Sequence, residues 1–174
     1  MAIADALLAE LEHEATTTRR VLERVPQAHL SWKPHPKSMS LGQLALHIAT
    51  VPGNVAELLA MDTVPAPPAF VQPEAATAAE LLPALTASVA KARQHLAGLD
   101  DAAMGAIWRL KSGDRELMAM PRVAFARAVM LNHWYHHRGQ MLVYLRLLDV
   151  PVPSVYGPTA DENPFAALAA AGTR

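Results

Sequence analysis

Two histidines spaced four residues apart are the side chains of this chain best placed for metal chemistry. His133 and His137 lie in the segment LNHWYHHRGQM, within an apolar run of strong helical character. Positions i and i+4 of an α-helix share one face, so the two imidazoles can converge on one ion. The spacing therefore predicts two ligands of a divalent metal.

A third ligand has to come from another segment, and His47 is the best candidate. It lies in LGQLALHIATV, where a lone histidine stands among aliphatic residues. Burying an imidazole without a partner costs about 1 to 3 kcal/mol, so these histidines require hydrogen bonds or a metal. Three histidine ligands leave a coordination position free, which catalytic sites keep and structural sites fill. The competing interpretation is a group of core histidines that hydrogen bonds satisfy.

His136 lies three residues from His133 and could replace His137 by the same helical argument. The neighbours that His136 and His137 have on their respective faces of the helix favour His137 as the partner of His133. His133 and His137 fall on an apolar stripe, which continues through Ala126, Met130, Met141, Tyr144 and Leu148. His136 falls on a more mixed face, which carries Val129, Asn132, Gln140 and Val143. We therefore predict that His136 serves a neighbouring helix, a subunit contact or a hydrogen bond to a ligand.

The remaining histidines are predicted to be exposed: His13, His29, His35 and His95. His13 lies near Glu10 and Glu14, which indicates a solvated polar face. The other three lie in a proline-containing loop or beside basic residues.

Several polar side chains could complete the site. Tyr144 could line the pocket, and Asn132 or Gln140 could orient a ligand, because metal-bound histidines usually donate their second ring nitrogen to an acceptor. Asp161 and Glu162 could fold back from the tail to act as a general base. Acidic residues of a tail are more often exposed, which is the simpler expectation for both.

Composition narrows the chemistry further. The chain has 174 residues, enough for one domain with a real core, and its lack of cysteine excludes a disulfide, a thiolate zinc site and a cysteine nucleophile. Fifteen basic residues against sixteen acidic ones, without a basic run, disfavour nucleic-acid binding. The N-terminal segment lacks the pattern of a signal peptide, and no apolar stretch is long enough for a membrane span. We expect a cytoplasmic protein.

Hydrophobic periodicity and capping patterns predict four long helices. They run from about Ala2 to Val25, from Leu41 to a bend or break at Pro52 and on to about Met61, from Thr77 to about Gly98, and from Pro121 to about Leu148. A proline-rich crossover at 63–73 reads as irregular, and the turn residues KSGD allow a small β-hairpin within 107–120. The prediction is an all-α four-helix bundle in a single domain over residues 1–174, with a proline-rich tail from about residue 150. Trp134 is expected to be a core or interface aromatic residue.

The chain resembles the DinB/YfiT-like proteins. The resemblance spans most of the chain and is carried by LGQLALHIA, by NHWYHHRGQ and by the tail sequence LRLLDVPVPSVYGPTADE. It implies a four-helix bundle with a three-histidine metal site, in which His47, His133 and His137 are the ligands and His136 is not. Several members of the wider superfamily transfer low-molecular-weight thiols such as bacillithiol or mycothiol. The resemblance also implies a homodimer.

The expected function is that of a metal-dependent transferase. Zinc or nickel suits imidazole ligands, and a bound divalent ion would favour the thiolate form of a thiol cosubstrate, which then attacks a small electrophile. A chain without cysteine fits an enzyme that takes its thiol from a cosubstrate. Two alternatives remain: a hydrolase that uses the same metal to activate water, and a noncatalytic metal- or ligand-binding bundle.

Overall fold

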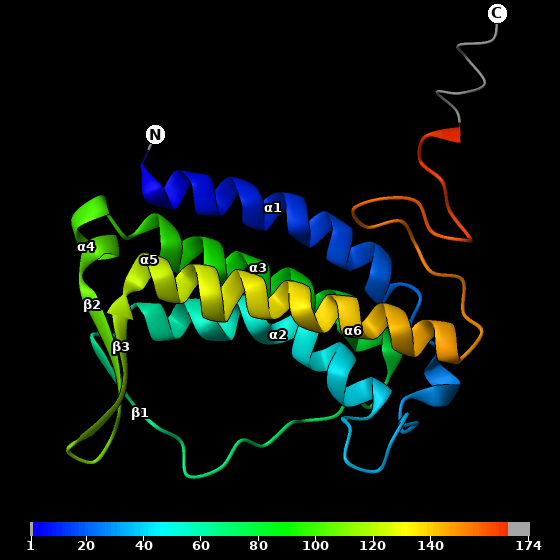
Figure 1. Ribbon diagram of the computed structural model, residues 1–174, viewed down its shortest axis with the longest axis horizontal. Helices are drawn as coiled ribbons and strands as arrows, with labels where there is room; N and C mark the ends of the chain where they lie inside the picture. Colours follow the sequence, from blue (N-terminus) through cyan, green and yellow to red (C-terminus); the bar gives the residue numbers. More distant parts are fainter. Residues whose placement is uncertain (1, 167–174) are drawn as a thin grey trace, which may run out of the picture.

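Four long helices lie side by side in the computed structural model, which describes residues 2–166 (Figure 1). They are α1 (Ile3–Leu22), α2 (Leu41–Leu59), α3 (Leu81–Ala97) and a composite last helix of α5 (Arg122–Phe125), a π-helical segment (Ala126–Asn132) and α6 (His133–Leu147). Helix α2 packs against α3 and α6, and α1 packs against α3. The predicted four-helix bundle is confirmed.

The apolar stripes of the sequence form the core of the bundle. Leu7 and Leu11 of α1 are buried, as are Leu85 and Leu96 of α3. Helix α2 is buried over most of its surface, from Leu41 to Leu59. This central position explains why its sequence is apolar nearly all round rather than on one stripe. His47 therefore sits on a helix that is enclosed by its neighbours.

Capping fixes where α2 and α3 begin. The Ser40 hydroxyl accepts a hydrogen bond from the Gln43 amide at 3.1 Å, and the Gln43 side chain accepts one from the Ser40 amide at 2.9 Å. The predicted capping box of α2 is thus present. Thr77 and Glu80 repeat this pattern, although a 3₁₀ turn at Ala78–Glu80 delays the start of α3 to Leu81. Helix α1 ends at Leu22, three residues before the predicted Val25.

Pro52 bends α2 without breaking it. Helix α2 is continuous from Leu41 to Leu59, and Figure 1 shows it changing direction along its length. A proline at this position has no amide hydrogen for the carbonyl of Ile48, one turn earlier. The indole Nε1 of Trp134 donates to that carbonyl at 2.8 Å. The buried oxygen therefore keeps a hydrogen-bond partner, supplied by α6.

Helix α3 completes the bonding around the bend. The Gly53 amide donates to the Ser88 hydroxyl at 2.8 Å, and that hydroxyl donates to the Thr50 carbonyl at 3.1 Å. A side chain at position 53 would meet the Ser88 backbone, because a Cβ built there lies 2.8 Å from the Ser88 carbonyl oxygen. Glycine at this position thus permits the close approach of α2 and α3.

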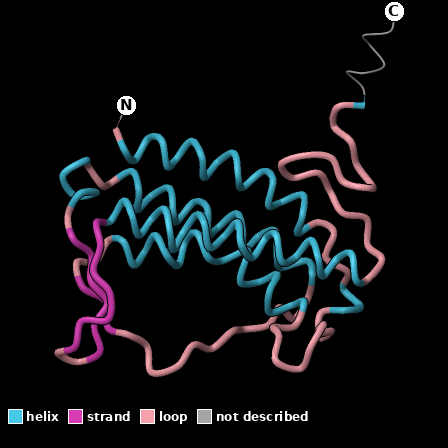
Figure 2. Tube along the Cα trace, in the orientation of Figure 1, coloured by secondary structure: helices cyan, strands magenta, loops and turns pink. Residues whose placement is uncertain are grey.

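A three-stranded sheet closes one end of the bundle (Figure 2). Strands β2 (Ile107–Ser112) and β3 (Arg115–Pro121) form the predicted hairpin, with Gly113 at a φ of 58° in its turn. Strand β1 (Thr63–Pro65) pairs in parallel with β2, so the start of the predicted irregular crossover is in fact a short strand. A short helix that the sequence did not predict, α4 (Asp101–Gly105), precedes the hairpin.

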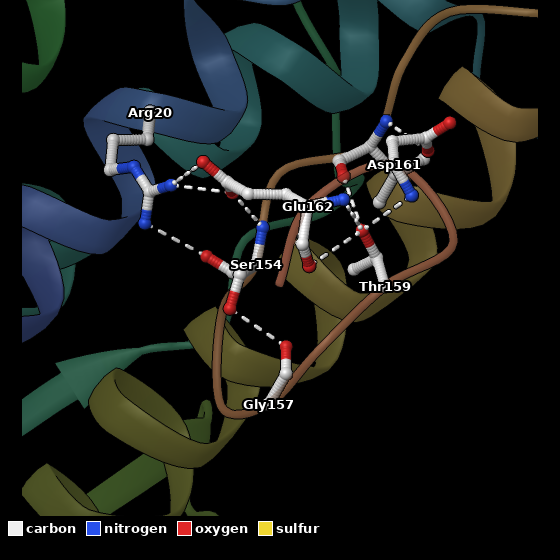
Figure 3. Close-up of polar contacts among 7 residues, drawn as sticks. Arg20, Ser154, Gly157, Thr159, Asp161 and Glu162 are labelled. Carbon is white, nitrogen blue, oxygen red and sulfur yellow. Dashed lines mark hydrogen bonds and ion pairs between the residues drawn. The ribbon is translucent and has the colours of Figure 1, made fainter. Parts of the chain in front are cut away.

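The tail after α6 has no helix or strand up to residue 164 and is held by its own acidic residues (Figure 3). Asp161 accepts a hydrogen bond from the Val152 amide at 2.8 Å and pairs with Arg146. Glu162 pairs with Arg20 of α1 at 2.6 Å. These contacts fix the tail against α1 and the end of α6. Within residues 2–166, no helix is long and apolar enough to cross a membrane.

We predict that Trp134→Phe lowers the free energy of unfolding by about 1 to 3 kcal/mol, because it leaves the buried Ile48 carbonyl without a donor. A double-mutant cycle with Pro52→Ala separates this loss from the change in side-chain volume. Alanine at position 52 supplies an amide hydrogen for the same carbonyl, so Trp134→Phe should cost less in that background. Urea unfolding of the four proteins measures both costs, and equal costs would contradict the assigned hydrogen bond.

Candidate metal centre

Three histidines from two helices converge beside the bend of α2. Ring nitrogens of His47, His133 and His137 all lie within 4.8 Å of one another. The Nε2 atoms of His47 and His133 are 3.0 Å apart. The ring centroid of His137 lies 4.5 Å from that of His47 and 4.4 Å from that of His133. The structure thus brings together the three residues that the sequence singled out, in a cluster that could hold a metal ion.

The backbone around each histidine explains this convergence. His133 is the first residue of α6, immediately after the π-helical segment Ala126–Asn132, and His137 lies one turn further along. Short π-helical stretches are frequent at functional sites, because their wider turn changes the direction of the residues that follow. The i, i+4 argument for His133 and His137 holds, since both lie on the regular α-helical part.

The hydrogen bond from Trp134 to Ile48 aligns the two ligand-bearing helices. Ile48 directly follows His47 on α2, and Trp134 directly follows His133 on α6. The indole donates across the same helix pair that the imidazoles bridge, at 2.8 Å. The contact therefore fixes the axial position of α6 relative to α2, and it does so one residue away from the clustered histidines in each helix. Trp134 is fully buried, as expected for a core aromatic residue.

Burial keeps all three imidazoles neutral at pH 7. Loss of solvation, followed by the neighbouring His137 and His133, lowers the pKa of His47 to about 4. Burial is also the main cause that lowers the pKa values of His133 and His137. A neutral imidazole carries a lone pair on one ring nitrogen, which is the form that binds a metal. The electrostatics of the cluster therefore suit a cation better than a proton.

A chain of hydrogen bonds orients His137. Its Nδ1 and the side-chain oxygen of Gln140 are 3.0 Å apart. The amide of Gln140 in turn donates to the Tyr144 hydroxyl at 3.5 Å, and this hydroxyl donates to the Met39 carbonyl at 3.2 Å. With Nδ1 donating to Gln140, Nε2 of His137 is left to accept a metal. The structure thus contains the hydrogen bond to a clustered histidine that was considered for Gln140.

Other residues that sequence reasoning placed near the site lie elsewhere. Tyr144 is buried and reaches the cluster only through Gln140, so it does not line the cavity. Asn132 is exposed, and the described residues include no hydrogen bond from its side chain to a histidine. Asp161 and Glu162 are engaged within the tail and with arginines, away from the cavity. The structure does not bring these tail carboxylates to the cavity, and Asp161 is exposed, as the simpler expectation had it.

The other histidines lie outside the cluster. His136 is exposed, with its ring centroid 4.9 Å from that of His137, and it does not belong to the group of converging nitrogens. His13 is exposed as predicted, but its neighbour Glu14 is buried and pairs with Arg138 of α6 at 2.5 Å. The prediction for His13 is therefore confirmed, although one of the two glutamates on which it rested is buried.

A cavity of about 320 Å³ opens above the three histidines. Its other walls come from α2, the π-helical segment and two loops, through Met39, Val51, Asn54, Val55, Leu58, Phe70, Gln72 and Val129. Among the described residues that line it, none is a carboxylate, a lysine or an arginine. The arrangement offers three possible metal ligands and space for a small molecule. Apart from the histidines, the described residues that line the cavity supply no acidic or basic side chain.

A family comparison agrees with these features. The model of the DinB family matches residues 1–164. The chain belongs to the DinB family. No curated protein matches the chain. The family resemblance that the three sequence segments carried is thus confirmed.

Two solved structures resemble this DinB protein over most of its length. A DinB-like protein from Bacillus cereus ATCC 10987 is 25% identical, with a TM-score of 0.65, over 87% of this chain and 97% of that one. A DinB-like protein from Bacillus subtilis is 19% identical, with a TM-score of 0.66, over 86% of this chain and 96% of that one. The second likeness concerns the fold alone.

The donor set of this DinB protein fits a divalent transition metal. Three nitrogen ligands at the usual zinc–nitrogen distance of about 2.0 to 2.1 Å lie about 3.3 Å from one another in a tetrahedral site. The observed 3.0 Å between His47 and His133, and the 4.8 Å limit for the whole group, bracket that separation. Small rotations of the imidazoles would suffice to accommodate an ion.

Metal-free protein should lose stability as the pH falls from about 6.5 toward 4. His47 has a pKa of about 4 in the folded chain against 6.5 ordinarily, so in this window the unfolded chain binds the additional proton. Urea unfolding with a chelator, at pH 7 and pH 5, should show a smaller pH dependence for His47→Gln than for wild type. His29→Gln changes an exposed histidine outside the cluster, is the matched control, and should keep the wild-type dependence. An unchanged dependence in His47→Gln would contradict the assignment.

We expect Gln140→Leu to weaken metal binding about 10- to 100-fold, because His137 loses the acceptor that orients its ring. Asn132→Leu removes an amide from the same helix without touching a ligand, and should bind metal like wild type. Competition with a chromophoric chelator measures both affinities, and circular dichroism checks that each variant is folded. Equal affinities of the two variants would exclude an orienting role for Gln140.

Proposed function

We propose that this DinB protein is a metal-dependent transferase, in which His47, His133 and His137 hold a divalent ion, zinc or nickel. The reaction is the transfer of a low-molecular-weight thiol to a small electrophile. The observation that carries the proposal is the convergence of three imidazoles at the wall of a cavity of about 320 Å³. A bound ion would supply the positive charge that favours the thiolate form of a thiol at neutral pH.

The lack of a carboxylate, lysine or arginine among the described residues that line the cavity favours a thiol over water as the nucleophile. A free thiol has a pKa of about 8.5, so a nearby cation is enough to ionise it at pH 7. Hydrolysis usually needs a further group that positions and deprotonates water or protonates the leaving group. The described cavity residues include no carboxylate for that purpose. The lack of cysteine in the chain means that the thiol must come from a cosubstrate.

The residues of the chain divide the work of such a transfer. The three imidazoles would bind the metal ion. Gln140 holds His137 in the orientation that leaves its Nε2 free to bind that ion. The apolar wall of Val51, Val55 and Leu58 displaces water from the reacting groups. The sulfur forms a bond to the electrophilic carbon as the bond to the leaving group breaks, and the thiol proton passes to solvent.

The homodimer and the cytoplasmic location stay predictions. The outer face of α6 carries the exposed side chains of Val143 and Leu147, which is compatible with a contact between two copies. Oligomeric state does not enter the proposed chemistry, because all three histidines belong to one chain.

The experiment compares metal content with thiol-dependent turnover in untagged protein. Inductively coupled plasma mass spectrometry measures bound zinc and nickel, and conjugation of 1-chloro-2,4-dinitrobenzene to bacillithiol, mycothiol or glutathione releases chloride and measures transfer. His137→Ala should lose the metal and reduce turnover more than about 100-fold, because a ligand is removed. His136→Ala alters the adjacent histidine and should keep both properties.

Two results would overturn the proposal. If His137→Ala lost the metal but kept its turnover, the reaction would not depend on the ion. If metal-free wild-type protein failed to take up added zinc or nickel, the cluster would be a group of hydrogen-bonded core histidines.

A further inference from the structure

The cavity above the histidines has a neutral, largely aliphatic wall. Helix α2 contributes Val51, Val55 and Leu58, and the π-helical segment contributes Val129. Val51 and Val55 belong to the buried core, so the hydrophobic core forms this part of the cavity wall. Asn54 and Gln72 are the polar residues of the wall apart from the histidines, and both are uncharged amides.

The charged residues of the wall-forming helices are neutralised outside the cavity. Glu57 of α2 pairs with Lys91 of α3. Arg127 of the π-helical segment pairs with Glu10 of α1 at 2.6 Å. None of these four residues lines the cavity. A charged group of a bound molecule would therefore give up its hydration without gaining a protein counter-ion, which is unfavourable.

The mouth of the cavity is also apolar. Phe70, in the loop after β1, lines the cavity and has 83% of its surface exposed. The acidic residue of this loop, Glu74, accepts a hydrogen bond from the Ser40 hydroxyl at 2.6 Å and does not line the cavity. An aromatic side chain at such an opening can contact an apolar ligand as it enters.

We infer that the cavity selects substrates whose body next to the reacting atom is uncharged and apolar. This inference rests on the proposed function for the identity of the reacting atom. It excludes a carboxylate or ammonium group held against the wall of Val51, Val55 and Leu58. A cosubstrate thiol that carries such groups must keep them beyond the mouth at Phe70.

Two rigid thiols of similar size test the inference in cobalt-loaded protein. 4-Methylbenzenethiol and 4-mercaptobenzoate differ only in the para group, which the ring holds away from the sulfur. Sulfur-to-cobalt charge-transfer absorption reports binding of each one. The methyl compound should bind about 10-fold more tightly, because the carboxylate meets no counter-ion in the wall. Equal or tighter binding of 4-mercaptobenzoate would overturn the inference.

Two neighbouring residues of the mouth supply a matched pair of variants. Phe70 and Val71 are 83% and 82% exposed, so lysine at either position should leave the fold intact, and Phe70 alone of the two lines the cavity. Phe70→Lys places a cation at the opening and should reduce the preference for the methyl compound to less than about 3-fold. Val71→Lys should keep the wild-type preference. The same effect from both variants would contradict selection within the cavity.

A second measurement on metal-free protein separates this inference from the proposed function. Methyl NMR of Val51, Val55 and Val129 reports binding of 4-methylphenol and of 4-hydroxybenzoate, neither of which needs a metal. The phenol should shift these methyl signals, and the benzoate at the same concentration should not. Shifts from both ligands, or from neither, would overturn the inference. Absence of a charge-transfer band with every thiol, together with the expected methyl shifts, would instead reject the proposed function alone.

Discussion

Pro52 leaves the carbonyl of Ile48 without its helical donor, and the indole of Trp134 donates to it from the facing helix at 2.8 Å. The exchange replaces a local hydrogen bond of α2 with a contact between α2 and α6. Because a buried carbonyl without a partner is costly, the register of the two helices is constrained at this point. His47 and His133 directly precede the two bonded residues, so the same constraint brings their ring nitrogens together.

The two sides of α6 solve the problem of buried polar groups in different ways. Arg138 faces α1 and is compensated fully, by an ion pair with Glu14 at 2.5 Å and a hydrogen bond to Thr18 at 3.1 Å. His137, the preceding residue, faces α2, where its neighbours are two further imidazoles. These rings are half-buried and no carboxylate among the described residues lies beside them, so their pKa values are lowered. The cluster therefore offers neutral imidazole ligands to a cation. Helix α6 thus carries the Arg138–Glu14 ion pair on the side facing α1, and two histidines of a cluster that could accept a cation on the side facing α2.

Sequence reasoning succeeded where the signal was local. Apolar periodicity predicted the four long helices, and the Ser40 and Gln43 pair placed the start of α2 at the correct residue. The i, i+4 spacing and a lone histidine in an apolar segment identified the three clustered residues. Strand β1 was missed because it is only three residues long and depends on a distant partner, β2. The burial of Glu14 was missed for the same reason, since its arginine partner lies on another helix.

The charge distribution also bears on the part that an added ion would play in the proposed reaction. Neutral imidazoles can donate lone pairs, but with lowered pKa values they are poor bases for a thiol at pH 7. The tail carboxylates that could have served as bases are occupied by Arg146 and Arg20. None of the described residues that line the cavity is a lysine or an arginine, so in the proposed reaction a bound ion would supply the positive charge that favours a thiolate. The aliphatic wall strengthens that effect, because an anion and a cation attract each other more strongly where water is excluded.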